Sequence, residues 1–412
     1  MLAARTDISG RFQSASRQCD SLPGPRARRV AACRTPRWGQ RQRFHGPRGR
    51  ERRLRPGAVE RPEGDSRHRS KEIGENDGTS HDYFQYWDGT KPAYNDGEDG
   101  LRQLDYVLAR AAASGIRLII PLVTNWRGNG GMDQYVRWAG GQYHDDFYTN
   151  PVIKGWYKDW ITHLLNRVNT LTGVAYKDDP TIMAWELANA PRCKGGDDSY
   201  PTSSGCTAAT ITAWADEMSQ YVKSVDGNHL LSVGDEGFYC TDPGGPDWTN
   251  NCSQGVDTLA LARLPEIDLM SPQLFADKWG KDAAWGTSWI TQHLADGREI
   301  GKPVVLSAFG LPNKAVRNPV YRDWTDAFRT GGGAGFAFWQ INEEISGQTL
   351  PDLDGYTVDC PGPVCRTITN AGMLMNRRAP ELIDPVADDD TAVTAARTMN
   401  PGTFYIDNIR AE

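Results

Sequence analysis

Three tryptophans that could bind a sugar ring stand near the ends of short apolar segments. Trp126 closes VTNW at 123–126, while Trp279 and Trp339 lie in MSPQLFADKWG and FAFWQIN. The flat face of an indole can stack on the apolar C–H face of a pyranose while polar neighbours bind its hydroxyls. These positions are candidates for a carbohydrate site. Ordinary packing at the rim is the alternative for each of them.

The elements around these residues alternate between helix and strand from residue 76 onward. The pattern predicts strands at 116–123, 181–187, 230–233, 268–274, 303–306 and 335–339, and helices at 101–113, 151–171, 210–225, 256–264, 283–295, 319–330 and 367–376. Strands separated by helices pair in parallel through right-handed crossovers. Six such units predict the α/β class and a (β/α)8 TIM barrel that lacks its first two βα units. The chemistry of a barrel sits where its strands end.

The first part of the chain differs from the rest in charge. Residues 1–73 hold 19 basic and 7 acidic side chains, a balance of +12, whereas the whole 412-residue chain carries −6 and the remaining 339 residues therefore −18. We interpret residues 1–75 as disordered, because Arg and Pro dominate them without apolar periodicity. Their composition also suits a GC-rich frame translated out of register. A basic arm for nucleic acid is the alternative.

The other boundaries follow from the same scan. The barrel is expected over residues 76–384, and residues 385–412 read as a linker followed by a remnant of a β-sandwich carbohydrate-binding module. A frayed tail packed on the barrel is the alternative for the last segment. No run of about 18 apolar residues is present to span a membrane, and no apolar core of a signal peptide follows Met1.

Six cysteines in the barrel segment fall into three locally close pairs. Cys193 and Cys206, Cys240 and Cys252, and Cys360 and Cys365 each flank loop-like sequence. These pairs are the simplest of about fifteen possible connectivities, with free thiols as the alternative. An even count in loops favours disulfides and hence an oxidising, secreted setting.

Longer phrases resemble the endo-β-1,4-mannanases of glycoside hydrolase family 5, which are retaining barrel hydrolases. The phrases are YFQYWDG at 83–89, GGMDQYVRW at 130–138, WELANAPRC at 185–193, VGDEGF at 233–238 and VVLSAFG at 304–310. The resemblance covers about residues 76–376. It implies β-mannan or manno-oligosaccharides as substrate, Asn189 as a donor to the sugar and Trp339 as a stacking platform.

The chain departs from the family pattern at the positions that carry the chemistry. The acid/base Glu that the family places after Asn189 is Ala190 here, and the nucleophile Glu is Ala308. Where the family has a His-Leu-Tyr pattern, this chain has Gln273 and Phe275 around Leu274. Retaining hydrolysis needs two carboxyl groups about 5–5.5 Å apart. We therefore expect an inactive or severely impaired chain that still binds mannan.

Other carboxylates offer an alternative in which the enzyme is active. Glu186 shares the strand parity of Ala190 but lies about 13 Å deeper, where we expect a structural role. The carboxylates nearer the rim are those of Glu236, Asp277, Glu343 and Glu344; solvated loop charge is their simpler interpretation. We expect a monomer without cofactor, metal, nucleic-acid partner or membrane contact.

Overall fold

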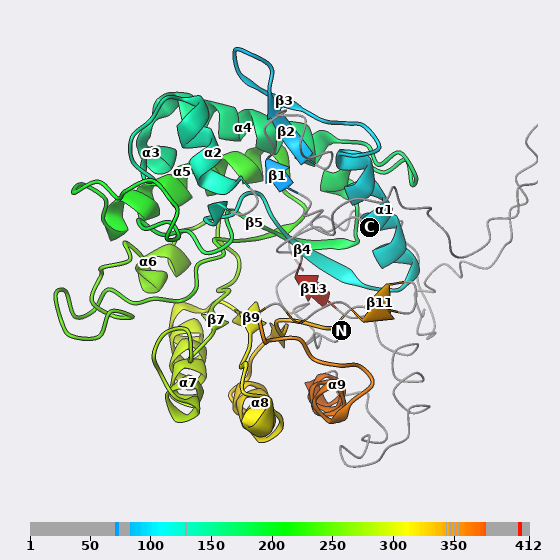
Figure 1. Ribbon diagram of the computed structural model, residues 1–412, viewed down its shortest axis with the longest axis vertical. Coiled ribbons are helices and arrows are strands. Elements are labelled where there is room, and N and C mark those ends of the chain that lie inside the picture. Colours follow the sequence, from blue (N-terminus) through cyan, green and yellow to red (C-terminus); the bar gives the residue numbers. More distant parts are fainter. Residues whose placement is uncertain are drawn as a thin grey trace, which may run out of the picture. The chain divides into compact units, whose positions relative to one another are not determined.

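The computed structural model describes residues 71–73, 83–127, 130–342, 344–345, 348–349, 352, 354–375 and 403–405. Its largest sheet has four parallel strands in the order β13, β4, β5 and β6 (Figure 1). Their bounds are Thr403–Tyr405, Arg117–Pro121, Ile182–Glu186 and Leu230–Ser232. Burial of both faces explains why β4 and β5 are apolar rather than alternating. The predictions for residues 1–70 lie outside the described residues.

The later barrel strands are short and also pair in parallel. β7 (Gln273–Leu274) pairs with β9 (Ala308–Phe309), and β8 (Val305–Leu306) pairs with β10 (Gly335–Phe336). The strand predicted at 268–274 is interrupted: Met270 forms a parallel bridge with Val304, but Pro272 has no N–H to donate to the next step of the ladder. Its carbonyl instead accepts a hydrogen bond from the Ser307 backbone N–H at 2.9 Å.

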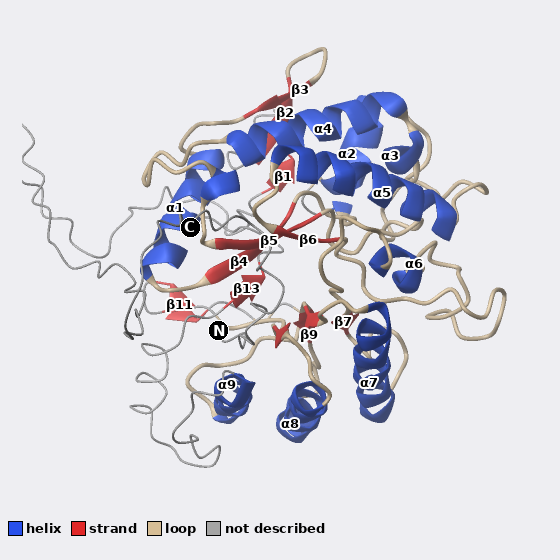
Figure 2. Cartoon of the chain, turned by 180° about the vertical axis from the view of Figure 1, so that it is seen from behind, coloured by secondary structure: helices blue, strands red, loops and turns tan. Residues whose placement is uncertain are grey.

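Helices follow the strands as the barrel pattern requires. Their bounds are α1 Leu101–Ala113, α2 Gly131–Trp138, α3 Asp146–Thr149, α4 Pro151–Asn166, α5 Ala208–Val225, α6 Thr258–Ala262, α7 Ala283–Ile300, α8 Lys314–Thr330 and α9 Pro363–Met375, with a 3₁₀ turn at Tyr176–Asp178. Figure 2 shows α7, α8 and α9 lying side by side. No helix among the described residues has the length and apolar content to cross a membrane.

Local sequence explains where these helices begin and end. α1 has the predicted bounds, because Leu101, Leu104 and Leu108 line one buried face at helical spacing. α8 begins at Lys314 rather than at the predicted residue 319. The Asn313 side chain caps its first turn by accepting from the Ala315 N–H. Pro319 therefore lies inside the helix, where it removes a single backbone hydrogen bond.

Small strands lie at both ends of the described chain. β1 (Lys71–Ile73) pairs in parallel with β2 (Tyr83–Trp87), which pairs antiparallel with β3 (Pro92–Tyr94). β1 thus precedes the boundary expected at residue 76. β11 (Glu344–Ile345) and β12 (Gln348–Thr349) form a hairpin. β13, in the tail expected to be a module remnant or a frayed end, pairs with the free edge of β4, with Phe404 opposite Leu118.

The core is rich in aromatic side chains. Four tryptophans on helices are buried: Trp160, Trp214, Trp289 and Trp324. Trp156 is partly exposed and packs edge-on against Trp87. Edge-to-face and tilted contacts connect these rings across helices, which stabilises each pair beyond simple area burial.

Three disulfides close loops in the described chain, and they have the predicted pairing. They join Cys193 to Cys206, Cys240 to Cys252, and Cys360 to Cys365, with 13, 12 and 5 residues of separation. Closing a loop of this size restricts the unfolded chain and stabilises the fold by about 2–4 kcal/mol for the two longer loops.

The disulfides predict the thiol count of the unreduced protein. Titration of the denatured chain with a thiol reagent should find at most two reactive groups, Cys19 and Cys33, because the other six cysteines are oxidised. Pretreatment with a reductant is the control and should expose eight. More than two thiols without reductant would show that a disulfide is absent from the purified protein.

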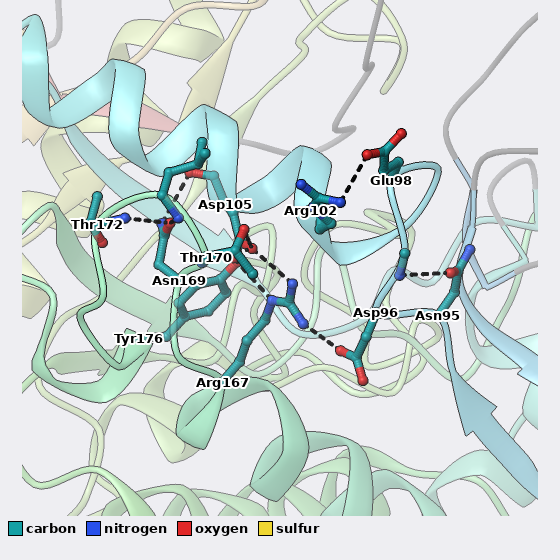
Figure 3. Close-up of polar contacts among 12 residues, drawn as sticks. Asn95, Asp96, Glu98, Arg102, Asp105, Arg167, Asn169, Thr170, Thr172 and Tyr176 are labelled. Carbon is teal, nitrogen blue, oxygen red and sulfur yellow. Dashed lines mark hydrogen bonds and ion pairs between the residues drawn. The ribbon is translucent and has the colours of Figure 1, made fainter. Parts of the chain in front are cut away.

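A buried carboxylate joins α1 to the segment after α4 (Figure 3). Asp105 accepts from Arg167 Nε at 3.0 Å and Nη2 at 2.8 Å, from the Tyr176 hydroxyl at 2.6 Å, and from the Thr170 hydroxyl at 2.8 Å. Burial would raise the pKa of Asp105, but these donors favour the ionised form and lower the pKa below its usual value. The network fixes the entry to β5.

Removing this charge should destabilise the fold in a pH-dependent way. Asp105→Asn should lower the free energy of unfolding by about 3 kcal/mol at pH 7, because the largely buried Arg167 loses its buried counter-ion and keeps only the exposed Asp96. The contribution of a carboxyl with a depressed pKa is present above its unfolded value and is lost as pH falls through the folded value. The difference between parent and variant in urea unfolding should therefore shrink below about pH 4.

Glu98→Gln is the matched control for this measurement. Glu98 forms an exposed ion pair with Arg102, which lies in the first turn of α1. Such pairs contribute roughly 0–1 kcal/mol to the free energy of unfolding. Equal losses in the two variants would contradict a special role for Asp105.

Candidate functional site

The candidate site lies beyond the end of β5 and at β9, around Ala190 and Ala308, the two positions singled out from the sequence. Ala190 lies four residues beyond Glu186, is 1% exposed and has a left-handed backbone with φ of 54°. Its N–H donates to the Gly234 carbonyl at 2.9 Å. A left-handed residue other than glycine costs about 1–2 kcal/mol. The chain therefore keeps a strained turn at this position although no carboxylate is present.

Ala308 begins β9 and lies directly opposite Gln273 in the parallel register. Both residues are buried, and the methyl group of Ala308 offers no atom that can attack carbon or transfer a proton. The neighbouring strand end is joined by a bridge between Thr124 and Asn189. The register thus places the ends of β4, β5, β7 and β9 around one region.

Two amide side chains connect these strand ends. Gln273 Nε2 donates to Asn189 Oδ1 at 3.0 Å, and Asn189 Nδ2 donates to the Thr124 hydroxyl at 3.3 Å. The backbone carbonyl of Gln273 accepts a hydrogen bond from the Trp289 indole N–H at 2.9 Å. Asn189 is consequently held in a single orientation. The amide of Gln273, unlike an imidazole, cannot act as a proton acceptor near neutral pH.

An aromatic pair covers the end of β9. The Phe275 ring meets the Tyr356 ring edge-on at 5.6 Å, and the ammonium of Lys278 lies within 5 Å of both ring centres, at 4.9 and 4.6 Å. The Tyr356 hydroxyl donates to Asp277. Burial, followed by this hydrogen bond, raises the pKa of Tyr356. A Cβ on Gly310 would lie 2.5 Å from the Tyr356 ring, so glycine is needed for this close packing.

Trp126 stands at the rim with 36% of its surface exposed. The Arg192 guanidinium lies 5.4 Å from its ring centre and 4.7 Å from that of Phe238. The same guanidinium binds the buried Glu236 carboxylate at 2.5 Å. This ion pair fixes Arg192 and, through it, one side of the Trp126 indole.

The other two candidate tryptophans have different surroundings. Trp279 is 5% exposed and packs against Phe238 and Trp289, at 5.1 and 5.4 Å between ring centres. Such burial fits the packing alternative. Trp339 is partly exposed, and its indole N–H donates to Asp354 Oδ2 at 2.8 Å. Trp126 and Trp339 therefore retain surface that a ligand can reach.

The candidate replacement carboxylates are engaged elsewhere or lie apart. Glu186 is fully buried in β5, where Ser232 donates to it at 3.2 Å, as expected for a structural carboxylate. Glu236 is bound to Arg192, and Asp277 is exposed and bound by Tyr356. Glu344 belongs to β11, and Glu343 lies outside the described residues.

One further acid at the end of β6 has an unusual protonation behaviour. Burial raises the pKa of Asp235 to about 6, although hydrogen bonds from Thr258 and the Gly237 N–H oppose the shift.

Among the residues that the structure describes, no three or more His, Cys, Asp or Glu side chains are grouped to hold a metal ion.

Comparison with known proteins identifies this arrangement. The family model for GH family 5 beta-mannosidase-like proteins matches residues 88–326, more than half of the chain. The chain belongs to this glycoside hydrolase family. The match confirms the predicted relationship, and it includes the ends of β4, β5, β7 and β9, where the site lies.

Individual family 5 relatives agree. Putative mannan endo-1,4-beta-mannosidase 5 of Oryza sativa is 38% identical over 67% of this chain and 60% of its own length. Probable mannan endo-1,4-beta-mannosidase A of Aspergillus flavus is 36% identical over 67% and 66%. This chain thus spans somewhat less than two thirds of these two curated relatives.

Solved structures establish the fold of this family 5 member. The endo-1,4-beta-mannanase of Rhizomucor miehei is 40% identical with a TM-score of 0.69, over 74% of this chain and 85% of that one. The endo-beta-1,4-mannanase of Thermotoga petrophila is 38% identical with a TM-score of 0.64, over 71% and 66%. The chain has the (β/α)8 TIM-barrel fold. It aligns with only part of each solved mannanase, which is consistent with a truncated barrel.

Several site residues could not be found from the sequence. Arg192 lies two residues after Ala190 in the phrase WELANAPRC, and this proximity is the one local signal for it. Tyr356 is separated from Phe275 by about eighty residues, and nothing in its own segment indicates this contact. Their roles follow from the tertiary structure.

The raised pKa of Asp235 predicts a stability change with pH. A carboxyl with a folded pKa above its unfolded value binds more protons when folded, so stability falls as pH rises between about 4 and 6. Asp235→Asn removes this penalty and keeps an acceptor for the Gly237 N–H. Relative to the parent, the variant should gain up to about 3 kcal/mol at pH 7.5 and much less at pH 4.5.

Chemical unfolding at these two pH values tests the prediction. Asp257→Asn is a matched control, because Asp257 caps α6 nearby through backbone N–H groups. A gain for Asp235→Asn that is the same at both pH values would refute the raised pKa.

Proposed function

We propose that this chain is an endo-mannanase-like glycoside hydrolase scaffold that binds β-mannan or manno-oligosaccharides and does not hydrolyse them. The observation that carries the proposal is the placement of Ala190 and Ala308 at the two strand ends where the family resemblance puts the acid/base and the nucleophile. The relatives named above are mannan endo-1,4-beta-mannosidases.

The chemistry of a retaining glycosidase explains the expected loss. One carboxylate attacks the anomeric carbon and forms a glycosyl–enzyme bond, while the other carboxyl protonates the departing oxygen and later activates water. Loss of proton transfer alone reduces the rate by about 10²–10⁴. Loss of the nucleophile removes the covalent route itself. Two alanines supply neither function.

The surrounding carboxylates support this interpretation. Glu236 is the counter-ion of Arg192, and deprotonating a substrate group would require breaking a buried ion pair. Asp277 accepts from Tyr356 at the exposed rim. Glu186 lies in the buried part of β5. Each of the three therefore already binds a polar group of the protein.

Residues that could bind the sugar are still present. Trp339 and Trp126 keep exposed aromatic surface, and stacking on a pyranose requires no carboxylate. The Asn189 amide is oriented by Gln273 and Thr124 before any ligand arrives, which reduces the entropy that binding must overcome. We expect weak binding of oligosaccharides along the strand ends.

The cellular setting is proposed from the cysteines. Three disulfides in the described chain favour an oxidising compartment and hence a secreted protein. We further propose a monomer that functions without a nucleic-acid partner or membrane attachment.

Hydrolysis of mannohexaose tests the central claim. The parent chain should release no reducing sugar above background, and Ala190→Glu or Ala308→Glu alone should not restore the retaining mechanism, because each lacks the other carboxylate. The double variant should recover only part of the family's activity. Gln273 and Phe275 still lack the imidazole and the phenol beside the nucleophile.

The matched control is the double variant Ala112→Glu and Ala113→Glu, which adds the same charge to the exposed end of α1. Calorimetric titration with mannohexaose checks binding by the parent, and Trp339→Ala should weaken it about tenfold. Robust hydrolysis by the parent would overturn the proposal and favour an active hydrolase with a replacement carboxylate.

A further inference from the structure

Three buried polar side chains form a chain of hydrogen bonds behind the end of β4. Asp133 of α2 faces His144, with 2.7 Å between Oδ1 and Nδ1, and His144 Nε2 lies 2.8 Å from Asn125 Oδ1. All three side chains are at most 2% exposed. We call this set the Asp133–His144–Asn125 relay. It is separate from the alanines that replace the catalytic carboxylates.

The partners determine where the hydrogens lie. Asn125 Nδ2 donates to the Lys194 carbonyl at 3.2 Å, so the Asn125 oxygen must face His144. If the Asn125 amide were flipped, its oxygen would face the Lys194 carbonyl oxygen without a hydrogen between them. Both ring nitrogens of His144 therefore face oxygen acceptors, one of Asp133 and one of Asn125.

The relay anchors the loop that the first disulfide closes, residues 193–206. Lys194 is held through Asn125, and the Tyr200 N–H donates to Asp133 Oδ2 at 3.2 Å. The backbone N–H of His144 donates to the Pro201 carbonyl at 2.9 Å. The loop is thus attached to the relay at three points along its length.

The same loop touches the rim tryptophan. Arg192, which precedes the disulfide, stacks on Trp126, and a Cβ on Gly196 would lie 3.6 Å from the six-membered ring of that indole. Trp126 itself follows Asn125 directly in the chain. The relay consequently fixes both the backbone that carries Trp126 and the loop that packs against it.

From this geometry we infer that His144 is a positioning residue for carbohydrate binding: the Asp133–His144–Asn125 relay holds loop 193–206 and the Trp126 indole in place for a manno-oligosaccharide. The inference rests on the proposed function for its ligand. Its structural part, the anchoring of the loop, does not.

A double-mutant cycle tests the link to Trp126. His144→Gln cannot donate to Asp133 and Asn125 together, and a buried group left without its partner should weaken mannohexaose binding about tenfold by calorimetry. In a Trp126→Ala background the same change should weaken binding less than about twofold, because the positioned group is gone. In a Trp339→Ala background the full loss should persist.

Hydrogen exchange of the amides measures the loop without any sugar. His144→Gln should lose protection in loop 193–206, including at the Tyr200 amide, and keep it in α5 and α7. The control His163→Gln, whose ring is partly exposed and faces Asp96, should change neither loop protection nor affinity.

The outcomes separate the two claims. Equal affinity losses for His144→Gln in all three backgrounds, or loss of protection spread over the whole barrel, would overturn the inference and leave a general structural role. If the parent binds no mannohexaose, the proposed function fails and with it the ligand of this inference. In that case the hydrogen-exchange protection of loop 193–206 tests only whether the relay anchors the loop.

Discussion

Parallel backbone pairing between distant strands decides which side chains share the site. The pairing of Gln273 with Ala308 and the bridge between Thr124 and Asn189 bring together residues that are far apart in sequence. A shift of one residue in either register would turn the strand-end side chains to the opposite face. The amide contact between Asn189 and Gln273 depends on this register.

The backbone around Ala190 keeps a strained turn that the surrounding packing imposes. Ala190 retains a left-handed conformation, and its N–H is still bound by Gly234. Gly234 is itself required, because a Cβ there would lie 1.9 Å from the Ala188 carbonyl and 2.6 Å from Glu186 Cγ. Backbone strain of this kind persists only where surrounding structure imposes it. The packing around Ala190 therefore holds its left-handed conformation in place.

The sequence predicted features that depend on local patterns and on motif order. The α1 bounds follow from apolar spacing, the three disulfides were expected as the simplest pairing of nearby cysteines, and the family was expected from the resemblance of several phrases. Features that depend on tertiary contacts could not be read in this way. The early start of α8 required its asparagine cap, and the interrupted strand before β7 required the effect of Pro272 on the ladder.

The candidate site shows the same division. The proximity of Ala190 and Ala308 to strands was predictable, because each lies in a phrase that begins with a predicted strand. The surroundings of Trp279 were not, because its burial depends on Phe238 and Trp289 from other elements. His144 gave no local signal either, since its two partners precede it by 11 and 19 residues.

β13 has a consequence for how the chain would respond to cleavage. Thr403, Phe404 and Tyr405 pair with the edge of β4, although almost three hundred residues separate the two strands. Pairing of two strands requires a matching direction and hydrogen-bond register, and it does not require that the strands be close in sequence. A single cut between Met375 and Thr403 would turn this intramolecular pairing into a bimolecular one. Its occupancy would then depend on protein concentration, because the tether that supplies a high effective concentration would be lost.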